Sequence, residues 1–183
     1  RGVKFIDSYA FSSCSSLTSI DVATNNENYM SEDGVLFNKD KTILICYPAG
    51  KGAASYKIPE GVIEIFDDAF SSCSSLTSVT IPESVTSIGY GAFSGCSGLT
   101  NVTIGDGVTE IGSYVFDGTA IYNNESNWEN GVLYIDNCLI EVKRDIINGD
   151  YTVKDGTRVI AMYAFEGCSG LTSVTIPESV TGI

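Results

Sequence analysis

Histidine is absent from this 183-residue sequence. Its absence excludes Ser-His-Asp and Cys-His catalysis, because both mechanisms use an imidazole as the general base. The six cysteines contain no C-x-x-C pair, so the usual zinc-ligand pattern is also missing. We therefore expect no metal site, no cofactor and no enzyme of these classes.

Basic residues are scarce, with 10 Lys plus Arg against 23 Asp plus Glu, which gives a formal net charge of -13. Such a chain repels phosphate-rich partners, and nucleic acid is excluded as the expected ligand. No apolar run reaches the roughly 18 residues of a membrane helix, so we expect no membrane insertion in this segment. The opening residues RGVKFIDSYAF also lack a signal-peptide pattern.

What the sequence does contain is a repeat. LTSVTIPESVTSIGYGAFSGC (76–96) returns as LTNVTIGDGVTEIGSYVFDGT (99–119), 23 residues later, with the apolar positions kept and the polar ones changed. The pattern can be aligned on five phenylalanines: Phe11, Phe70, Phe93, Phe116 and Phe165. A fixed period with constant apolar positions predicts a solenoid, in which each unit buries its apolar face against its neighbours.

Each unit predicts one coil with two short extended pieces. In the first, Val79 and Ile81 point inward and Ser78 and Thr80 point outward, and Pro82 ends the strand because it has no N–H to donate. ESVTSIG supplies the second piece, and YGAFSGC is too short for more than one helical turn. The strand ends are predicted at Val22, Ile58, Ile81, Ile104, Asn127, Val153 and Ile176, which makes seven coils with the fifth the weakest match.

Two long intervals interrupt the period. GVLFNKDKTILICYP (34–48) and GVLYIDNCLIEV (131–142) each read as strand, polar turn, strand, and predict β-hairpin inserts within variant coils near 23–58 and 120–153. We expect a single domain over residues 1–183. Because the chain opens on RGVKFI and closes on ESVTGI, in the same repeat phase, we also expect it to be a fragment of a longer array.

These residues resemble the BspA-like, or treponemal-type, leucine-rich repeats, whose pattern is close to L-x-x-I-x-I-P-x-x-V-x-x-I-G-x-x-A-F-x-x-C. The match covers nearly the whole chain, with departures at Gly105, Thr119 and Tyr122. The resemblance implies a right-handed superhelix with a concave parallel β-sheet and single helical turns on its convex side. It also implies a secreted or surface-attached bacterial protein used in adhesion.

The six cysteines have three interpretations: a disulfide framework, buried thiols or a zinc site. Four of them occupy the same position of the repeat and two lie in the hairpins (Cys14, Cys73, Cys96 and Cys168; Cys46 and Cys138). Equivalent positions in stacked coils point the same way, which is poor geometry for a bridge. The pattern favours six reduced thiols, with the four repeat cysteines buried.

Two further motifs have ordinary explanations. Carboxylate pairs occur in predicted turns, where acidic residues are usually solvated: Asp67 with Asp68, Glu32 with Asp33, and Asp106 near Glu110. GYGAFSG lacks the lysine of a phosphate-binding loop, and the repeat already explains its glycines. We expect no catalytic residue.

The candidate binding residues are the outward strand positions together with the single tryptophan: Ser78, Thr80, Asn101, Thr103, Ser173, Thr175 and Trp128. The outward residues are predicted to line one polar surface, although Ser and Thr also suit exposed strands with no ligand. Trp128 is either a binding hot spot or the residue that packs its insert, and packing is favoured.

We therefore expect a non-enzymatic interaction or adhesion module whose partner is a host or matrix protein, or a glycan. The alternative is an accessory glycan-binding or spacer segment of a larger extracellular enzyme. The extracellular or cell-surface location follows from the resemblance alone. The sequence leaves the ligand and the oligomeric state open.

Overall fold

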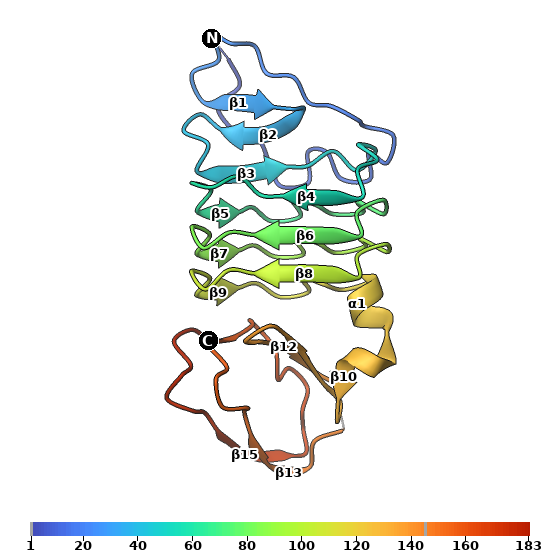
Figure 1. The fold of residues 1–183 in the computed structure, drawn as a ribbon, viewed down its shortest axis with the longest axis vertical. Helices are drawn as coiled ribbons and strands as arrows, with labels where there is room; N and C mark the ends of the chain where they lie inside the picture. The colour runs from blue at the N-terminus through green and yellow to red at the C-terminus, as the bar shows by residue number, and fades with distance from the viewer. Residues whose placement is uncertain (1, 145) are drawn as a thin grey trace.

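The computed structural model describes residues 2–144 and 146–183, and it shows a stack of β-coils with very little helix (Figure 1). Residues 1 and 145, which fall within the predicted domain of residues 1–183, lie outside the described residues. In the described part of the chain, no helix is both long enough and apolar enough to cross a membrane.

Each regular coil contributes one strand to each of two sheets, and the strands of successive regular coils pair in parallel. The first sheet contains β4 (Ser55–Lys57), β6 (Ser78–Ile81) and β8 (Asn101–Ile104) in that order. The second contains β5 (Glu64–Ile65), β7 (Ser87–Ile88) and β9 (Glu110–Ile111). Val79 pairs with Val102, and Ile88 pairs with Ile111. One 23-residue repeat is therefore one turn of the solenoid.

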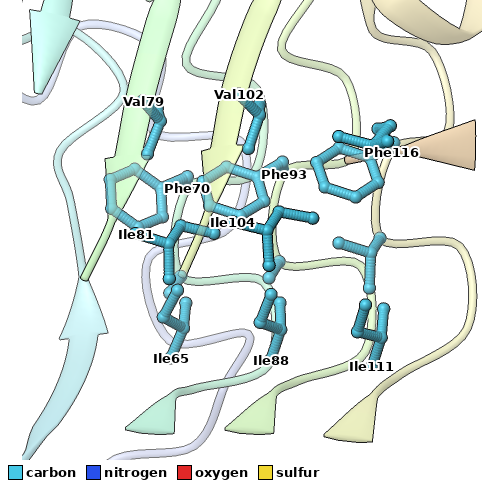
Figure 2. Packing of buried hydrophobic residues seen from close by; sticks show 14 of the residues in the cluster. Ile65, Phe70, Val79, Ile81, Ile88, Phe93, Val102, Ile104, Ile111 and Phe116 are labelled. Carbon is cyan, nitrogen blue, oxygen red and sulfur yellow. The ribbon is translucent and has the colours of Figure 1, made fainter. Parts of the chain in front are cut away.

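The inward positions form columns along the stack. The rings of Phe70, Phe93 and Phe116 are fully buried, and consecutive ring centroids lie 4.9 Å and 5.6 Å apart. Figure 2 shows these rings beside columns of isoleucine and valine from the same coils. Neighbouring strands are about 4.8 Å apart, so each side chain meets its own equivalent in the next coil. Because each inward side chain packs against its own equivalent, the inward positions are apolar in one repeat after another.

The segments around the repeat phenylalanines form turns instead of the predicted single helical turns. In one coil, the Ala69 amide donates to the Phe66 carbonyl and the Cys73 amide donates to the Phe70 carbonyl. Asp68 and Ser72 of this coil have φ angles of 54° and 62°. Left-handed residues at this spacing interrupt a right-handed helix, so the chain reverses direction here without one.

The fifth coil departs from the repeat, and the strand predicted to end at Asn127 is wrong. This residue lies in the 3-10 helix η1 (Glu125–Asn127), which follows the short helix α1 (Ala120–Asn123). Thr119, where the repeat has cysteine, caps α1 by accepting a hydrogen bond from the Tyr122 amide at 3.1 Å. An N-cap at this position favours a helical turn over an extended strand.

The strand predicted to end at Val22 is also wrong. Val22 lies in a segment without regular secondary structure, and its amide donates to Ser31 Oγ at 2.9 Å.

Antiparallel strands occupy both long intervals. In the first, β1 (Tyr29–Glu32), β2 (Val35–Asn38) and β3 (Ile43–Cys46) form a meander, and β3 then pairs in parallel with β5. In the second, β10 (Trp128–Glu129), β11 (Val132–Ile135) and β12 (Cys138–Val142) repeat the arrangement, and β12 pairs in parallel with β14 (Val159–Ile160).

The second insert separates two hydrophobic clusters. Alternate side chains of β11 and β12 pack with the regular coils on one face: Leu133, Ile135, Cys138 and Ile140. The others pack with the C-terminal coil on the opposite face: Val132, Leu139 and Val142. Strands buried on both faces are apolar at almost every position, which explains why Glu141 is the only charged residue in these two strands.

The C-terminal coil contains β13 (Gly149–Thr152) and β15 (Leu171–Thr175), which pair in parallel as a separate two-stranded sheet. This coil also contacts the regular stack, because the Met162 amide donates to the Ile111 carbonyl at 2.8 Å. A side chain at Gly182 would lie 1.9 Å from the carbonyl oxygen of Thr109, so this close contact requires glycine.

All six cysteines are thiols, and three of them are buried (Cys73, Cys96 and Cys138). The prediction that the four repeat cysteines are all buried is wrong for Cys14, which is exposed, and for Cys168, which is half-buried. Both belong to coils at the ends of the described stack, where fewer neighbouring coils cover them. In the middle of the stack, the Cys96 thiol donates to the Phe70 carbonyl at 3.0 Å.

Candidate interaction surface

The outward side chains of the first sheet form a polar face, which we define as Ser55, Lys57, Ser78, Thr80, Asn101 and Thr103. The strand register places them in two rows that cross the sheet. One row is Ser55, Ser78 and Asn101, and the other is Lys57, Thr80 and Thr103. Five of the six are exposed, and Ser78 is half-buried.

This face exists because the strands alternate strictly. Val79, Ile81, Val102 and Ile104 are buried between the outward positions, and the core fixes them in place. A shift of one residue in register would bury the polar row and expose the apolar one. The core columns therefore determine which side chains reach the solvent.

The four candidate residues of β6 and β8 make no side-chain hydrogen bond within residues 2–144 and 146–183 (Ser78, Thr80, Asn101 and Thr103). Neighbouring threonines differ. Thr77 donates its hydroxyl to the Ala54 carbonyl at 2.9 Å, and Thr100 donates to the Thr77 carbonyl at 3.2 Å. Thr77 and Thr100 thus join successive coils, whereas the hydroxyls and the amide on the polar face are available to a partner.

A hairpin borders the polar face, and the residue that meets the face is Asp136. Its Oδ2 accepts a hydrogen bond from the Ile104 amide at 2.7 Å, at the end of β8. Asp136 lies in the turn between β11 and β12 and has a φ of 49°, a conformation that Asp tolerates better than most residues. Sequence reasoning missed this residue, although Asp-Asn between two apolar strands signals a tight turn.

Ser173 and Thr175 do not continue the polar face, so the prediction of one continuous surface is wrong. They lie on β15 and pair with Asp150 and Thr152 of β13, in the separate C-terminal sheet. Both the Ser173 hydroxyl (2.7 Å) and the Thr172 hydroxyl (3.0 Å) donate to Asp150 Oδ1. These hydrogen bonds lower the pKa of Asp150. The second insert separates the two sheets.

Trp128 packs its insert and is not exposed for binding. Its indole is 8% exposed, and Nε1 donates to the Tyr122 carbonyl at 2.7 Å. The Tyr122 ring meets it edge-on with centroids 5.1 Å apart, and Lys143 Nζ lies 4.7 Å from the indole ring centroid. Trp128 is therefore a packing residue of the second insert.

One carboxylate of each predicted pair is used by the fold, and the prediction that the pairs lie in turns is wrong for Glu32 and Glu110, which lie in β1 and β9. Asp67 Oδ1 accepts a hydrogen bond from the Tyr90 amide at 2.7 Å, Glu32 forms an ion pair with Lys41, and Asp106 lies 3.4 Å from Arg158. Within the described residues, no group of three or more potential metal ligands occurs.

One carboxyl group has a perturbed environment in the second insert. Glu141 is half-buried, and burial raises its pKa despite the Tyr122 hydroxyl, which donates to Glu141 Oε1 at 3.0 Å. Asp117, Arg144 and Glu166 also act on it electrostatically. Glu141 belongs to the packing around α1 and the insert, away from the polar face.

A family model described as the BspA type leucine rich repeat region matches this chain in six copies, over residues 1–39, 49–142 and 147–183. No curated protein gives a significant match.

Two solved structures show the same fold. One is a leucine-rich cell surface protein from Faecalibacterium prausnitzii, with 31% identity, a TM-score of 0.61 and 93% of this chain covered. The other is the pneumococcal vaccine antigen PcpA, with 26% identity, a TM-score of 0.58 and 89% of this chain covered. This chain spans 44% of the first structure and 34% of the second.

Proposed function

Because the chain belongs to the BspA-type leucine-rich repeat family, we propose that it is a non-enzymatic protein-interaction module of an extracellular or surface-attached bacterial protein. Its partner is a host or matrix protein, or a glycan, and the role is adhesion. The observation that carries this proposal is the polar face. It combines a rigid, buried support with hydroxyl and amide groups that have no hydrogen-bond partner in the described chain.

The extracellular location is supported by the similar structures. One of them is named as a cell surface protein and the other as a vaccine antigen. Both chains are more than twice as long as the part that this chain matches, so their roles as whole proteins come to this chain only by proposal.

The non-enzymatic character is supported by the sequence and by the site. Histidine is absent, one carboxylate of each pair is engaged in a hydrogen bond or an ion pair, and the polar face carries no carboxylate of its own. What the face offers is hydrogen bonding, which gives about 0.5 to 1.5 kcal/mol for each neutral contact. Several such contacts on a rigid sheet are needed for specific recognition.

The test is a binding screen of this chain against immobilised matrix proteins and glycans at physiological salt, followed by the double variant Thr80→Glu and Thr103→Glu. These residues are directly paired across β6 and β8, so the variant places two like charges in the middle of the face. We expect a large loss of affinity for the partner found in the screen. The melting temperature should fall only slightly, because directly opposed like charges destabilise a sheet by about 1 kcal/mol or less.

A matched control is the double variant Ser74→Glu and Ser97→Glu. Both serines are exposed, and they lie in the turns of the same two coils. The control adds the same charge and should keep its affinity. If the Thr80 and Thr103 variant binds as well as the unmodified chain, the polar face is only scaffold, and the adhesion role must rest on another surface.

A further inference from the structure

A second surface, on the turns that follow the second sheet, carries a row of exposed aromatic residues. We define this turn ridge as four tyrosines together with the exposed Met162, which lies beside them: Tyr9, Tyr90, Tyr114 and Tyr163. Each tyrosine comes two or three residues after the isoleucine that ends the second extended piece of its coil. Of the ten tyrosines in the chain, the four on the ridge are the exposed ones, with between 43% and 63% of their surface in solvent.

The ridge is continuous across neighbouring coils. The rings of Tyr90 and Tyr114 meet edge-on, with centroids 5.8 Å apart. The Tyr114 hydroxyl donates to Glu166 Oε2 at 3.3 Å, which links it to the coil that carries Tyr163. At the other end of the ridge, the negative charge of Asp68 raises the pKa of Tyr9. Burial raises the pKa of Asp68 itself, and its interaction with the Tyr9 hydroxyl opposes that rise.

Core packing does not explain the tyrosines at two of these positions. Tyr114 and Tyr163 have φ angles of 57° and 61°, and the equivalent positions of two other coils hold Asp68 and Gly91 in the same conformation. The left-handed region is unfavourable for bulky residues and easy for glycine. Two coils therefore present an exposed aromatic ring where glycine or aspartate would be easier to accommodate. Strained residues of this kind concentrate at functional sites.

The surroundings of the ridge are acidic. Asp67, Glu110, Tyr90 and Met162 help to line a groove of about 490 Å³ beside it. Asp68 and Glu166 lie along the row, and the neighbouring Arg144 is paired with Glu166 at 2.9 Å. The whole chain carries a net charge of -13. Aromatic faces among carboxylates attract cations, because the ring quadrupole and the negative charges act in the same direction.

We propose that the turn ridge binds an extended segment of a partner protein that carries lysine or arginine at alternate positions. In an extended chain, residues i and i+2 are about 6.6 to 6.8 Å apart, close to the 5.8 Å between the rings of Tyr90 and Tyr114. Two successive cations of such a segment can therefore each meet one of these two rings. The ridge is distinct from the polar face, and the inference does not depend on the function proposed for that face.

The test uses a fluorescent octapeptide of alternating arginine and serine, with binding measured by fluorescence anisotropy at low and at physiological salt. An analogue with citrulline in place of arginine removes the charge and keeps the shape. The unmodified chain should bind the arginine peptide saturably, bind it less tightly as salt rises and bind the citrulline peptide far more weakly. Absence of saturable binding, or equal binding of the citrulline analogue, overturns the proposal.

The decisive variant is Tyr114→Gly with Tyr163→Gly, which removes two rings at positions where glycine fits the backbone. Loss of two exposed cation–π contacts should weaken peptide binding about fivefold to thirtyfold. The pair Tyr114→Phe and Tyr163→Phe keeps the rings and should keep the affinity. Equal binding by the glycine variant would show that charge alone attracts the peptide, and would overturn the role of the ridge.

Two further measurements serve as controls for this comparison. Circular dichroism of the glycine variant checks the fold, and the pair Tyr114→Asn and Tyr163→Asn replaces it if the glycines disturb the turns, since Asn also tolerates this conformation. The Thr80→Glu and Thr103→Glu variant should bind the peptide undiminished. Loss of peptide binding in that variant would place the cation site on the polar face and overturn the proposal for the ridge.

Discussion

Replacement of Phe93 by alanine tests whether the aromatic column holds the stack together. The ring is fully buried, and it lies between Phe70 at 4.9 Å and Phe116 at 5.6 Å. The three rings belong to three successive coils. The Phe70 amide donates to the Ala92 carbonyl at 2.7 Å, and the Phe93 amide donates to the Val115 carbonyl at 3.0 Å. These bonds prevent the coils from closing around the cavity.

We expect Phe93→Ala to lower the free energy of unfolding by about 3 to 5 kcal/mol, the range for a buried phenylalanine whose cavity cannot collapse. The two ring contacts contribute about 0.5 to 1.5 kcal/mol each, within that range. Urea unfolding should be followed by circular dichroism and by the fluorescence of Trp128, because coincident transitions establish two-state behaviour.

The matched control is Phe5→Ala, because Phe5 is 75% exposed and its truncation should change the stability by within about 0.5 kcal/mol. A loss below roughly 1 kcal/mol for Phe93→Ala would refute the reasoning, since it would mean that the column contributes little to the stability of the stack.

Three further results are expected. Gly107→Ala should destabilise the fold by about 1 to 3 kcal/mol in urea unfolding, because its Cβ would lie 1.8 Å from the Glu83 carbonyl oxygen; unchanged stability would mean that the coils can separate. Alkylation of the native protein followed by mass spectrometry should modify exposed Cys14 quickly and buried Cys73 only after unfolding, and a disulfide at Cys73 would contradict the structure. Glu141 has a raised pKa in the fold, so its contribution to stability is present below its ordinary pKa of 4.5 and is lost as pH rises through the raised value. Glu141→Gln should therefore gain stability relative to the unmodified chain between pH 4 and pH 7, and a difference that is constant with pH would count against this burial effect.

The regular coils could be predicted from the sequence because each of them has the same 23-residue pattern of apolar positions. Ile81 and Ile104 end β6 and β8 as the pattern indicates, and the residues between them alternate between core and solvent. A 23-residue period with constant apolar letters leaves few other ways to bury those side chains. The outward direction of Thr80 and Thr103 follows from the same alternation.

The interruptions were harder to predict, because their structure depends on contacts between residues far apart in the sequence. Asn127 was assigned to a strand by its offset in the repeat, but the local caps at Thr119 and Asn124 favour helical turns. The conformation of the turns around the repeat phenylalanines was also missed. Asp68 and Tyr114 both have a positive φ, but an Asp or a Tyr in a sequence does not by itself indicate that conformation.

The sequence by itself determined the solenoid, the inward columns and the absence of histidine chemistry, because each of these depends only on residue type and period. The tertiary structure alone decided how far the polar face extends. Ser173 has the same repeat position as Ser78, yet the second insert separates the two sheets because its strands bury both faces between two hydrophobic clusters. The tertiary structure also gathered Tyr90, Tyr114 and Tyr163 into one ridge, since stacking places residues dozens of positions apart in neighbouring coils.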